Sequence, residues 1–509
     1  MNRSPATLDP GQRTTKRAAK PTQPTASRTV STPPELEVLP APRAISKRLR
    51  LVGLFAGLSL VYLAFSYLLA SWHPAHPTVL ANANRGQILL RDGTVMADRL
   101  PTRSNGSAAT KRAYPQGNLA GQVIGFQGRD RGLEGIEYFR DQALKSGQDV
   151  TLTLDPVFQA AAEAALERTV KAQGAQAGAV VALEAATGRV LAMANYPKFD
   201  PANWSRYPSQ ARLNRALRAQ FEPGSTVKAL VAAALIDAGQ ATPEDRIIAP
   251  MTRTLGRHVI NDVVSHPSDL SLTDVLRYSS NVGISNLAER LSPKQLHGYL
   301  TAFGLGQPMP LEGASTTPGV LRDWRGWQPL DRAAVSFGQG MSTTVLQLAS
   351  AFSVLTNDGR LVPPKLIETP PTVTGATADG KADGKTAERR VISQKAARQT
   401  RTMLRAVAEG RLAKVLGIPG YCLGGKTGTA QVAVNGRYSK DLFAALFAGY
   451  FPCEKPRVTM VVEIYGPKKQ INGSQVAAPV FREIAEEVLA YWQVQPNLER
   501  MSGTSGKAR

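Results

Sequence analysis

The chain has few of the side chains that bind metals and lacks the loops that bind nucleotides. Its 509 residues include two cysteines and five histidines, and these side chains do not form the ligand spacing of a zinc site. No glycine-rich phosphate loop stands between a predicted strand and a predicted helix. No internal repeat is present either, which argues against a solenoid or a propeller. We therefore predict no metal and no cofactor.

Acidic residues are scarce compared with basic ones. The chain has 39 Asp and Glu against 61 Lys and Arg, a net charge of +22. Such an excess can indicate a nucleic-acid-binding protein, but there is no basic patch interleaved with aromatics and no zinc or helix-turn-helix signature. We predict no nucleic-acid partner. The charge fits better with a tail close to anionic lipid and an outer domain that acts on an acidic polymer.

The N-terminal part has two contrasting segments. Residues 1–46 are basic, rich in Pro, Thr, Ser and Ala, and almost without apolar periodicity, so we expect a disordered cytoplasmic tail. Leu51 to Trp72 contains no charged residue and would be about 33 Å long as a helix. Basic residues precede this run but do not cluster after it. This asymmetry predicts a single-pass anchor at 47–73 in the inner membrane, with the catalytic domain on the outer side. A cleaved signal peptide is the alternative, disfavoured by the long run and the long tail.

The remaining sequence predicts an α+β fold, an antiparallel sheet flanked by helices. Hairpins are expected at 179–194 and 423–451, a further strand at 458–464, and helices at 156–171, 226–238 and 478–492. Residues 80–148 form a separate N-terminal module, in which 114–144 looks like a glycine-rich loop. The main domain is expected at 149–495, and residues 496–509 as a disordered tail.

Three short motifs carry the chemistry. They are Ser225-Thr226-Val227-Lys228, Ser279-Ser280-Asn281 and Lys426-Thr427-Gly428-Thr429, and their order is typical of penicillin-recognising serine enzymes. A serine hydroxyl needs a base within reach, and residues three apart on a helix share a face. Lys228 can be that base only if burial or a second positive charge, for which Lys426 is the candidate, lowers its pKa. Alone, the first motif would more often be a helix N-terminus with a solvated lysine.

With these motifs the chain from Arg85 onward resembles the class B penicillin-binding proteins, which are membrane-anchored peptidoglycan transpeptidases. Further strings carry the resemblance: Arg85-Gly86-x-Ile88, Gly132-Leu133-Glu134-Gly135, Phe221-Glu222-Pro223-Gly224, Phe337-Gly338-Gln339-Gly340 and Gly449-Tyr450-Phe451-Pro452. The resemblance implies a transpeptidase-like fold on a small N-terminal pedestal, which is the module 80–148.

The resemblance also implies roles for the motif residues. Ser225 would attack the penultimate D-Ala carbonyl of a peptidoglycan stem peptide, with Lys228 as the base. Ser279 and Asn281 would relay the leaving-group proton and orient the substrate, and Lys426 and the neighbouring Thr427, Gly428 and Thr429 would bind its carboxylate. Backbone N–H groups of Ser225 and Thr429 would form an oxyanion hole. β-Lactam antibiotics would acylate Ser225.

The pedestal departs from the family pattern because only a dozen residues, Leu100 to Lys111, stand where a long insertion is usual. There is also no room for a glycosyltransferase domain, which would need roughly 150 residues, so we expect a membrane glycosyltransferase and division-complex proteins as partners. The predicted role is septal wall synthesis in cell division. An elongation-type transpeptidase, a D,D-carboxypeptidase or β-lactamase, and a non-catalytic scaffold are the alternatives.

The two cysteines suggest a disulfide. Cys422 and Cys453 lie almost symmetrically about residues 435–439, so a hairpin that turns there would bring them opposite each other in an oxidising compartment. Two small buried hydrophobic side chains are the alternative.

Overall fold

The computed structural model describes residues 85–104, 107–368, 388–434 and 437–497, all of which belong to a compact unit spanning Pro77–Arg509. The predicted tail at 1–46, the predicted anchor at 47–73 and nearly all of the predicted tail at 496–509 lie outside the described residues. Of the described helices, none is both long and apolar enough to cross a membrane.

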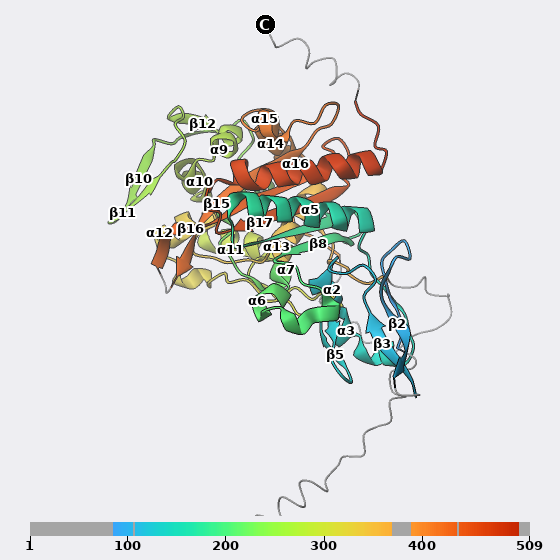
Figure 1. Ribbon diagram of the computed structural model, residues 1–509. Helices are drawn as coiled ribbons and strands as arrows, with labels where there is room; N and C mark the ends of the chain where they lie inside the picture. Colours follow the sequence, from blue (N-terminus) through green and yellow to red (C-terminus); the bar gives the residue numbers. More distant parts are fainter. Residues whose placement is uncertain (1–84, 105–106, 369–387, 435–436, 498–509) are drawn as a thin grey trace, which may run out of the picture. The chain divides into compact units, whose positions relative to one another are not determined.

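A five-stranded antiparallel sheet forms the centre of this unit (Figure 1). Its order is β15-β16-β17-β7-β8, with the bounds β7 Ala177–Glu184, β8 Val190–Tyr196, β15 Gly424–Val434, β16 Arg437–Phe451 and β17 Val458–Tyr465. β7 and β17 are buried along nearly their whole length because helices cover both faces. The predicted hairpins and the third strand are confirmed, and β15 lies at an edge of the sheet.

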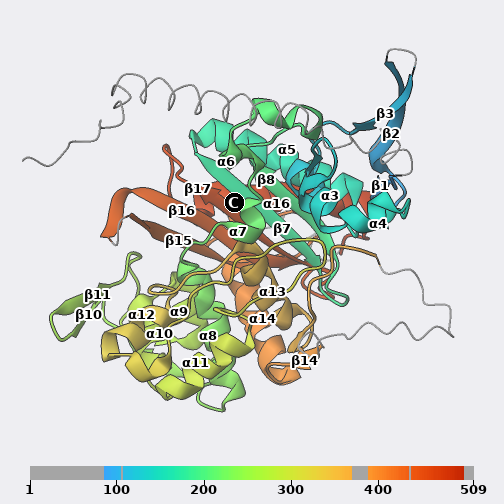
Figure 2. The same cartoon turned by 90° about the horizontal axis from the view of Figure 1, so that it is seen from below.

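Two helices cover one face of the sheet and a helical layer covers the other. α5 (Pro156–Gln173) and α16 (Gly473–Tyr491) lie side by side over β8, β17 and β16. α13 (Val345–Thr356) packs on β7 and β17 from the opposite side, next to α14 (Gln394–Glu409) and α8 (Val227–Asp237), as Figure 2 shows. The sheet flanked by helices that the sequence predicted is therefore present.

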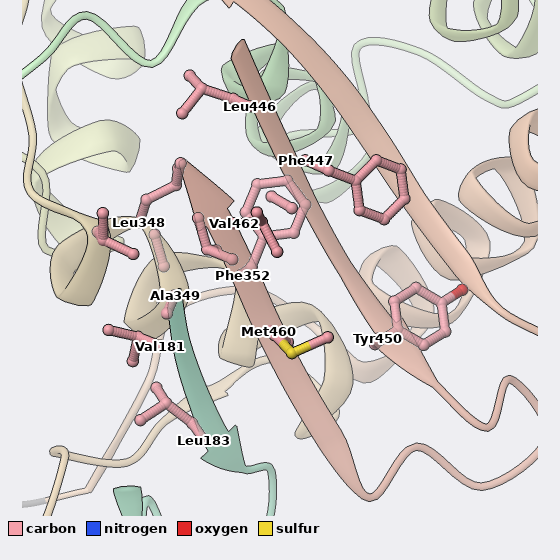
Figure 3. Close-up of a cluster of buried hydrophobic side chains, with 14 of the residues drawn as sticks. Val181, Leu183, Leu348, Ala349, Phe352, Leu446, Phe447, Tyr450, Met460 and Val462 are labelled. Carbon is pink, nitrogen blue, oxygen red and sulfur yellow. The ribbon is translucent and has the colours of Figure 1, made fainter. Parts of the chain in front are cut away.

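Strand alternation sends side chains into both layers of the core (Figure 3). Register pairs Val181 with Val461 and Leu446 with Glu463, so these side chains face the α13 layer. Phe447 and Val462, also paired, point to the opposite face, where Phe447 contacts Phe481 of α16 at 4.7 Å between ring centroids. All of these apolar side chains are buried, and this double core fixes the sheet against both layers.

The helical layer also includes α9 (Leu272–Tyr278), α10 (Asn281–Ala288), α11 (Pro293–Ala302) and α12 (Pro329–Ser336). Side-chain caps start several of these helices, as when Ser271 accepts the backbone N–H of Asp274. Smaller elements complete the domain: η2 Pro201–Arg206, α6 Ser209–Arg212, α7 Arg215–Arg218, η3 Gly224–Thr226, β9 Arg246–Ile248, β10 Thr252–Leu255, β11 His258–Asn261, β12 Asp269–Ser271, η4 Trp324–Gly326, β13 Arg360–Leu361, β14 Arg389–Arg390 and α15 Ala413–Leu416.

The pedestal is built on a four-stranded sheet of order β3-β2-β1-β6, with β1 Ile88–Leu89, β2 Val95–Ser104, β3 Ser107–Ala113 and β6 Val150–Thr151. The expectation of a loop over 114–144 is wrong. This segment forms α2 Gly121–Ile124, β4 Phe126–Gln127, β5 Gly132–Glu134, α3 Gly135–Phe139 and α4 Asp141–Lys145. Helices of four or five residues are too short to show a periodic pattern, and long-range contacts hold them instead.

A buried ion-pair cluster supplies those contacts. Arg85, 1% exposed, donates to Glu137 and Asp141, and Arg112 donates to the other oxygen of Glu137 at 2.6 Å. The cluster ties the start of the described chain to α3 and α4, and one carboxylate serves two guanidinium groups.

Candidate active site

Ser225 lies in the turn η3 that leads into α8, and two glycines shape this turn. Gly224 has a φ of 52°, in the left-handed region that favours glycine. Its N–H donates to the carbonyl of Gly338 at 3.1 Å. A Cβ on Gly338 would stand 2.2 Å from the Gly224 carbonyl oxygen, so the Phe337–Gly340 segment can support the turn only with glycine at this position.

Lys228, one helical turn after Ser225, is fully buried. Its Nζ lies 3.0 Å from Ser225 Oγ and 2.7 Å from Asn281 Oδ1, and it also contacts the backbone carbonyl of Ser279. The helical spacing predicted from the sequence thus brings amine and hydroxyl within hydrogen-bonding distance.

Ser279 joins the two lysines of the site. It ends α9 with a φ of 58°, a conformation that costs a residue other than glycine free energy and that surrounding contacts must hold. Ser279 Oγ lies 2.9 Å from Lys426 Nζ and 3.3 Å from Lys228 Nζ. The structure therefore brings together Ser225, Lys228, Ser279, Asn281 and Lys426, the five residues expected to be catalytic.

Asp262 holds the Ser279–Asn281 loop in place through hydrogen bonds, and this residue was not predicted from the sequence. Its carboxylate accepts hydrogen bonds from the Ser280 hydroxyl and the Asn281 N–H, both at 2.5 Å, and from Val282 N–H at 3.1 Å. Nε2 of His266 lies 2.8 Å from the same carboxylate, and both of these side chains are almost completely buried. No short motif contains Asp262, because it lies 18 or more residues before its partners in the loop.

The third motif lies on the edge strand β15. Register pairs Lys426 with Ala448 and Gly428 with Leu446, so Lys426 points toward the helical layer and Ser279. Thr427 and Thr429 alternate to the other side, where Thr429 Oγ1 accepts the N–H of Gly473 at 3.1 Å. Thr427 is half-buried and Thr429 is exposed, as suits residues at an open edge.

The two lysines differ in charge because their surroundings differ. Burial, together with the positive charge of Lys426, holds the pKa of Lys228 well below its usual value, although Asp262 acts in the opposite direction. Burial and the nearby Arg411 guanidinium lower the pKa of Lys426 to about 7. Near neutral pH Lys426 beside Ser279 is therefore partly charged, and the Lys228 amine beside Ser225 loses its proton more readily than an ordinary lysine does.

Glu222 was also not assigned a role from the sequence. Its Oε1 accepts hydrogen bonds from Gly340 N–H and Tyr438 Oη, both at 2.9 Å. Its Oε2 is buried without a partner among the described residues, and burial raises the pKa of this carboxyl. Glu222 lines a cavity of about 330 Å³ next to Ala430 and Gln431, beyond the third motif on β15.

Cys422 and Cys453 form a disulfide with a Cα–Cα distance of 5.2 Å. Cys422 lies just before β15 and Cys453 just after β16, so the bond closes the hairpin that carries Lys426. Across the described ranges, no group of three His, Cys, Asp or Glu side chains is arranged to hold a metal ion.

Comparison with known proteins decides the family. Residues 178–486 match the penicillin binding protein transpeptidase domain, and residues 85–167 match the penicillin binding protein A dimerisation domain. The chain belongs to the penicillin-binding protein transpeptidases. The motif geometry described above lies entirely within the first of these matches.

Curated relatives and solved structures agree with this membership. The probable peptidoglycan D,D-transpeptidase PenA of Neisseria meningitidis is 34% identical over 74% of this chain and 67% of its own length. The peptidoglycan D,D-transpeptidase FtsI of Escherichia coli K12 is 31% identical over 76% and 68%. Penicillin binding protein 3 of Mycobacterium tuberculosis, solved with ampicillin, is 31% identical with a TM-score of 0.75 and covers 81% of this chain and 96% of its own.

Proposed function

We propose that this penicillin-binding protein is a serine D,D-transpeptidase that cross-links peptidoglycan stem peptides through an acyl-enzyme on Ser225. The observation that carries the proposal is the 3.0 Å approach of the buried Lys228 amine to the Ser225 hydroxyl, in a site that lowers the pKa of that amine. Membership of the family and the names of the relatives support the same reaction.

The hydrogen bonds of Lys228 suit a neutral amine. Such an amine has two N–H donors and one lone pair. The donors match the Ser279 carbonyl and Asn281 Oδ1, and the lone pair is left for the Ser225 hydroxyl. Lys228 takes the hydroxyl proton as Ser225 Oγ bonds to the penultimate D-Ala carbonyl carbon, which gives a tetrahedral oxyanion.

Breakdown of this intermediate requires a proton on the departing nitrogen. Ser279 Oγ lies between the two lysines and can deliver a proton held by the Lys228 or Lys426 amine. The C–N bond then breaks and terminal D-Ala leaves, with Ser225 esterified. An amine of a neighbouring stem peptide attacks the ester, and Ser225 regains a proton as the cross-link forms.

The edge strand supplies the recognition groups. The hydroxyls of Thr427 and Thr429, at the open edge of β15, bind the carboxylate of the terminal D-Ala, and the charged form of Lys426 on the other side of the strand attracts it. The backbone N–H groups of Ser225 and Thr429 act as the oxyanion hole, in which one donor contributes about 3 to 4 kcal/mol. A β-lactam places its carboxylate and carbonyl in the same positions and acylates Ser225.

Intact-mass measurement tests this chemistry. Incubation with penicillin should add one antibiotic mass to the wild type and none to Ser225→Ala. Ser209→Ala, a change at an exposed serine, should label as the wild type does. The assignment fails if Ser225→Ala is still acylated or if the wild type is not. Rapid loss of the adduct would favour a β-lactamase, whereas release of D-Ala without cross-linking would favour a carboxypeptidase.

We further propose a septal role, in the inner membrane, with a glycosyltransferase and division proteins as partners. Similarity to FtsI and PenA and the short insertion from Leu100 to Lys111, which forms part of the β2–β3 hairpin, support this role over one in elongation. A fluorescent fusion of the full chain should concentrate at midcell, whereas a fusion along the side wall would contradict the septal role. Normal growth and cross-linking with Ser225→Ala as the only copy would favour a scaffold.

A further inference from the structure

A cationic pocket lies between the pedestal and the transpeptidase domain, away from the residues of the three motifs. Its volume is about 280 Å³, near the lower end for small-ligand sites. The lining residues come from the segment before β1, from β2 and β3, and from the segments around β4 and η2; they include Arg85, Arg99, Lys111, Arg112, Arg129 and Trp204. Five of these are cationic, and none of the described lining residues carries a carboxylate.

The guanidinium of Arg112 has hydrogen-bonding capacity left. This side chain is 5% exposed. Its Nε donates to Glu137 and its Nη1 to the Gly86 carbonyl, while Nη2 is buried without a hydrogen-bond partner among the described residues. A buried N–H of a charged group without an acceptor is costly, so this wall of the pocket favours a ligand that brings acceptor oxygens.

The two carboxylates behind the wall already have cationic partners. Glu137 pairs with Arg85 and Arg112, and Asp141 pairs with Arg85 and Lys145. Lys111 and Arg129 are exposed at the mouth, where they add positive charge toward solvent. The pocket therefore favours a negatively charged group.

We propose that this pocket binds a phosphate or diphosphate group. A guanidinium group can donate two parallel hydrogen bonds to two oxygens of a phosphate. A single carboxylate has only two oxygens, so it would satisfy the guanidinium groups of the pocket less completely. Trp204, stacked on Phe126 at 4.5 Å between ring centroids, offers an apolar wall for the group attached to the phosphate. The proposal does not depend on the transpeptidase reaction.

The phosphate can come from solution or from the membrane. If the predicted anchor ends near Trp72, the 13 residues from there to Arg85 reach at most about 45 Å, at 3.3 to 3.6 Å for each residue. A lipid headgroup is thus one source within reach of the pocket, and a soluble or wall-linked phosphate is the other.

The test uses the full chain in neutral phosphatidylcholine nanodiscs, titrated with inorganic pyrophosphate by calorimetry. Lys111→Gln with Arg129→Gln should weaken pyrophosphate binding about tenfold or more, because two charge-assisted contacts are lost. The matched control, Lys294→Gln with Lys395→Gln, removes the same charge at exposed positions elsewhere and should bind as the wild type does. Both double variants should take up penicillin at the wild-type rate, which shows that each is folded.

Two further measurements locate the site and the source. Pyrophosphate should change tryptophan emission in the wild type but not in Trp204→Phe. Added phosphatidic acid in the nanodisc should raise the apparent Kd for pyrophosphate if the natural ligand is a lipid headgroup, and leave it unchanged if the phosphate comes from solution. Absence of saturable binding, or equal affinity in the wild type and both double variants, overturns the proposal. If Lys111→Gln with Arg129→Gln does not fold, Lys111→Gln alone replaces it.

Discussion

At the residue scale, the two buried lysines of the site have different roles because their neighbours differ. Lys228 is surrounded by acceptor oxygens and lies near the charge of Lys426, whereas Lys426 lies closer to solvent-side charges such as Arg411. The pKa of Lys228 is held well below its usual value, and that of Lys426 is lowered to about 7. In the proposed mechanism Lys228 acts as the base and Lys426 as the cation that binds an anion.

This difference predicts how acylation depends on pH. Because the pKa of Lys426 is lowered to about 7, this amine is charged below that pH and neutral above it. Binding of the substrate carboxylate needs the charged form, so the second-order rate of penicillin acylation should fall as the pH rises through about 7. Stopped-flow measurement of the acylation rate over a pH series tests for this decline at alkaline pH.

Lys426→Arg is the control for this assignment. A guanidinium keeps its charge at alkaline pH, so the residual acylation of the variant should lose the alkaline decline. If the decline persists in Lys426→Arg, another group titrates and the assignment to Lys426 is wrong.

Asp262→Asn tests the support of the Ser279–Asn281 loop. An amide keeps one oxygen for the backbone N–H groups but places an NH2 group, which cannot accept a hydrogen bond, where Oδ2 accepts the Ser280 hydroxyl and contacts His266. Losing a hydrogen bond to a charged group costs roughly 1.5 to 3 kcal/mol, so acylation should slow by about tenfold or more. The control, Asp269→Asn, breaks only the surface pair with Arg246 and should leave the rate unchanged. Equal rates in both variants would show that the loop holds its shape without Asp262.

The site was predictable where its members form short motifs in a recognisable order. Ser225 and Lys228 are three residues apart, so helix geometry places them together, whereas Ser279, Asn281 and Lys426 were indicated by the order of the three motifs. Asp262 could not be found this way, because its role depends on how the chain folds back from β11 to α9 and α10.

At the element scale, the start of α16 sets the position of β15. The spacing of apolar residues predicted this helix from Ala478. The helix instead begins at Gly473 and contains Pro479. Its first residue packs directly on the strand, since a Cβ on Gly473 would stand 2.2 Å from Leu446 O and 2.3 Å from Gly428 O.

Gly473→Ala should therefore harm both folding and catalysis. The added methyl meets backbone rather than movable side chains, so the helix end must shift away from β15 at a cost of about 1 to 3 kcal/mol. Thr429, which accepts the Gly473 N–H, should move as well, and penicillin acylation should slow. Gly298→Ala, in α11 with open space around the new Cβ, should instead stabilise the protein by roughly 1 kcal/mol. Denaturant unfolding and acylation rates check both, and a harmless Gly473→Ala would contradict the tight packing.

The long strands and helices of the fold were predictable, whereas the pedestal was not. β7, β8, β16, α5 and α8 have uninterrupted apolar or periodic patterns over seven or more residues. The pedestal elements between 114 and 151 have two to five residues, and ion pairs such as that of Arg85 with Glu137 organise them. Arg85 and Glu137 are 52 residues apart in the sequence, and contacts over such a separation leave no local pattern.

At the scale of the described unit, the pedestal is held to the transpeptidase domain by buried contacts. Gln122 of α2 donates to the carbonyls of Pro197 and Ala211 at 2.8 and 2.7 Å. Glu163 of α5 accepts the N–H of Ala120 at 2.7 Å. We propose a domain boundary near residue 148, but β6, just beyond it, pairs with β1 of the pedestal, so the two parts share a sheet as well as a core.

These contacts predict that both parts unfold together. Phe126 is 1% exposed in the pedestal and contacts Phe199 at 5.9 Å between ring centroids. Phe126→Ala should lower the free energy of unfolding by about 3 to 5 kcal/mol and lower one shared thermal midpoint, because the cavity lies in the interface. In the proposed reaction penicillin acylates only the transpeptidase domain, so it should raise that same midpoint in the wild type.

A matched change separates this coupling from damage to the pedestal alone. Tyr138→Ala removes a half-exposed ring of α3 and should change stability by no more than about 0.5 kcal/mol. Calorimetry of the wild type should show one transition that includes the pedestal. If Phe126→Ala instead produced an early separate transition, while the later one kept its midpoint and its response to penicillin, the pedestal would be an independent folding unit. In that case Gln122, Glu163 and the shared strand pairing would contribute too little to couple the two parts.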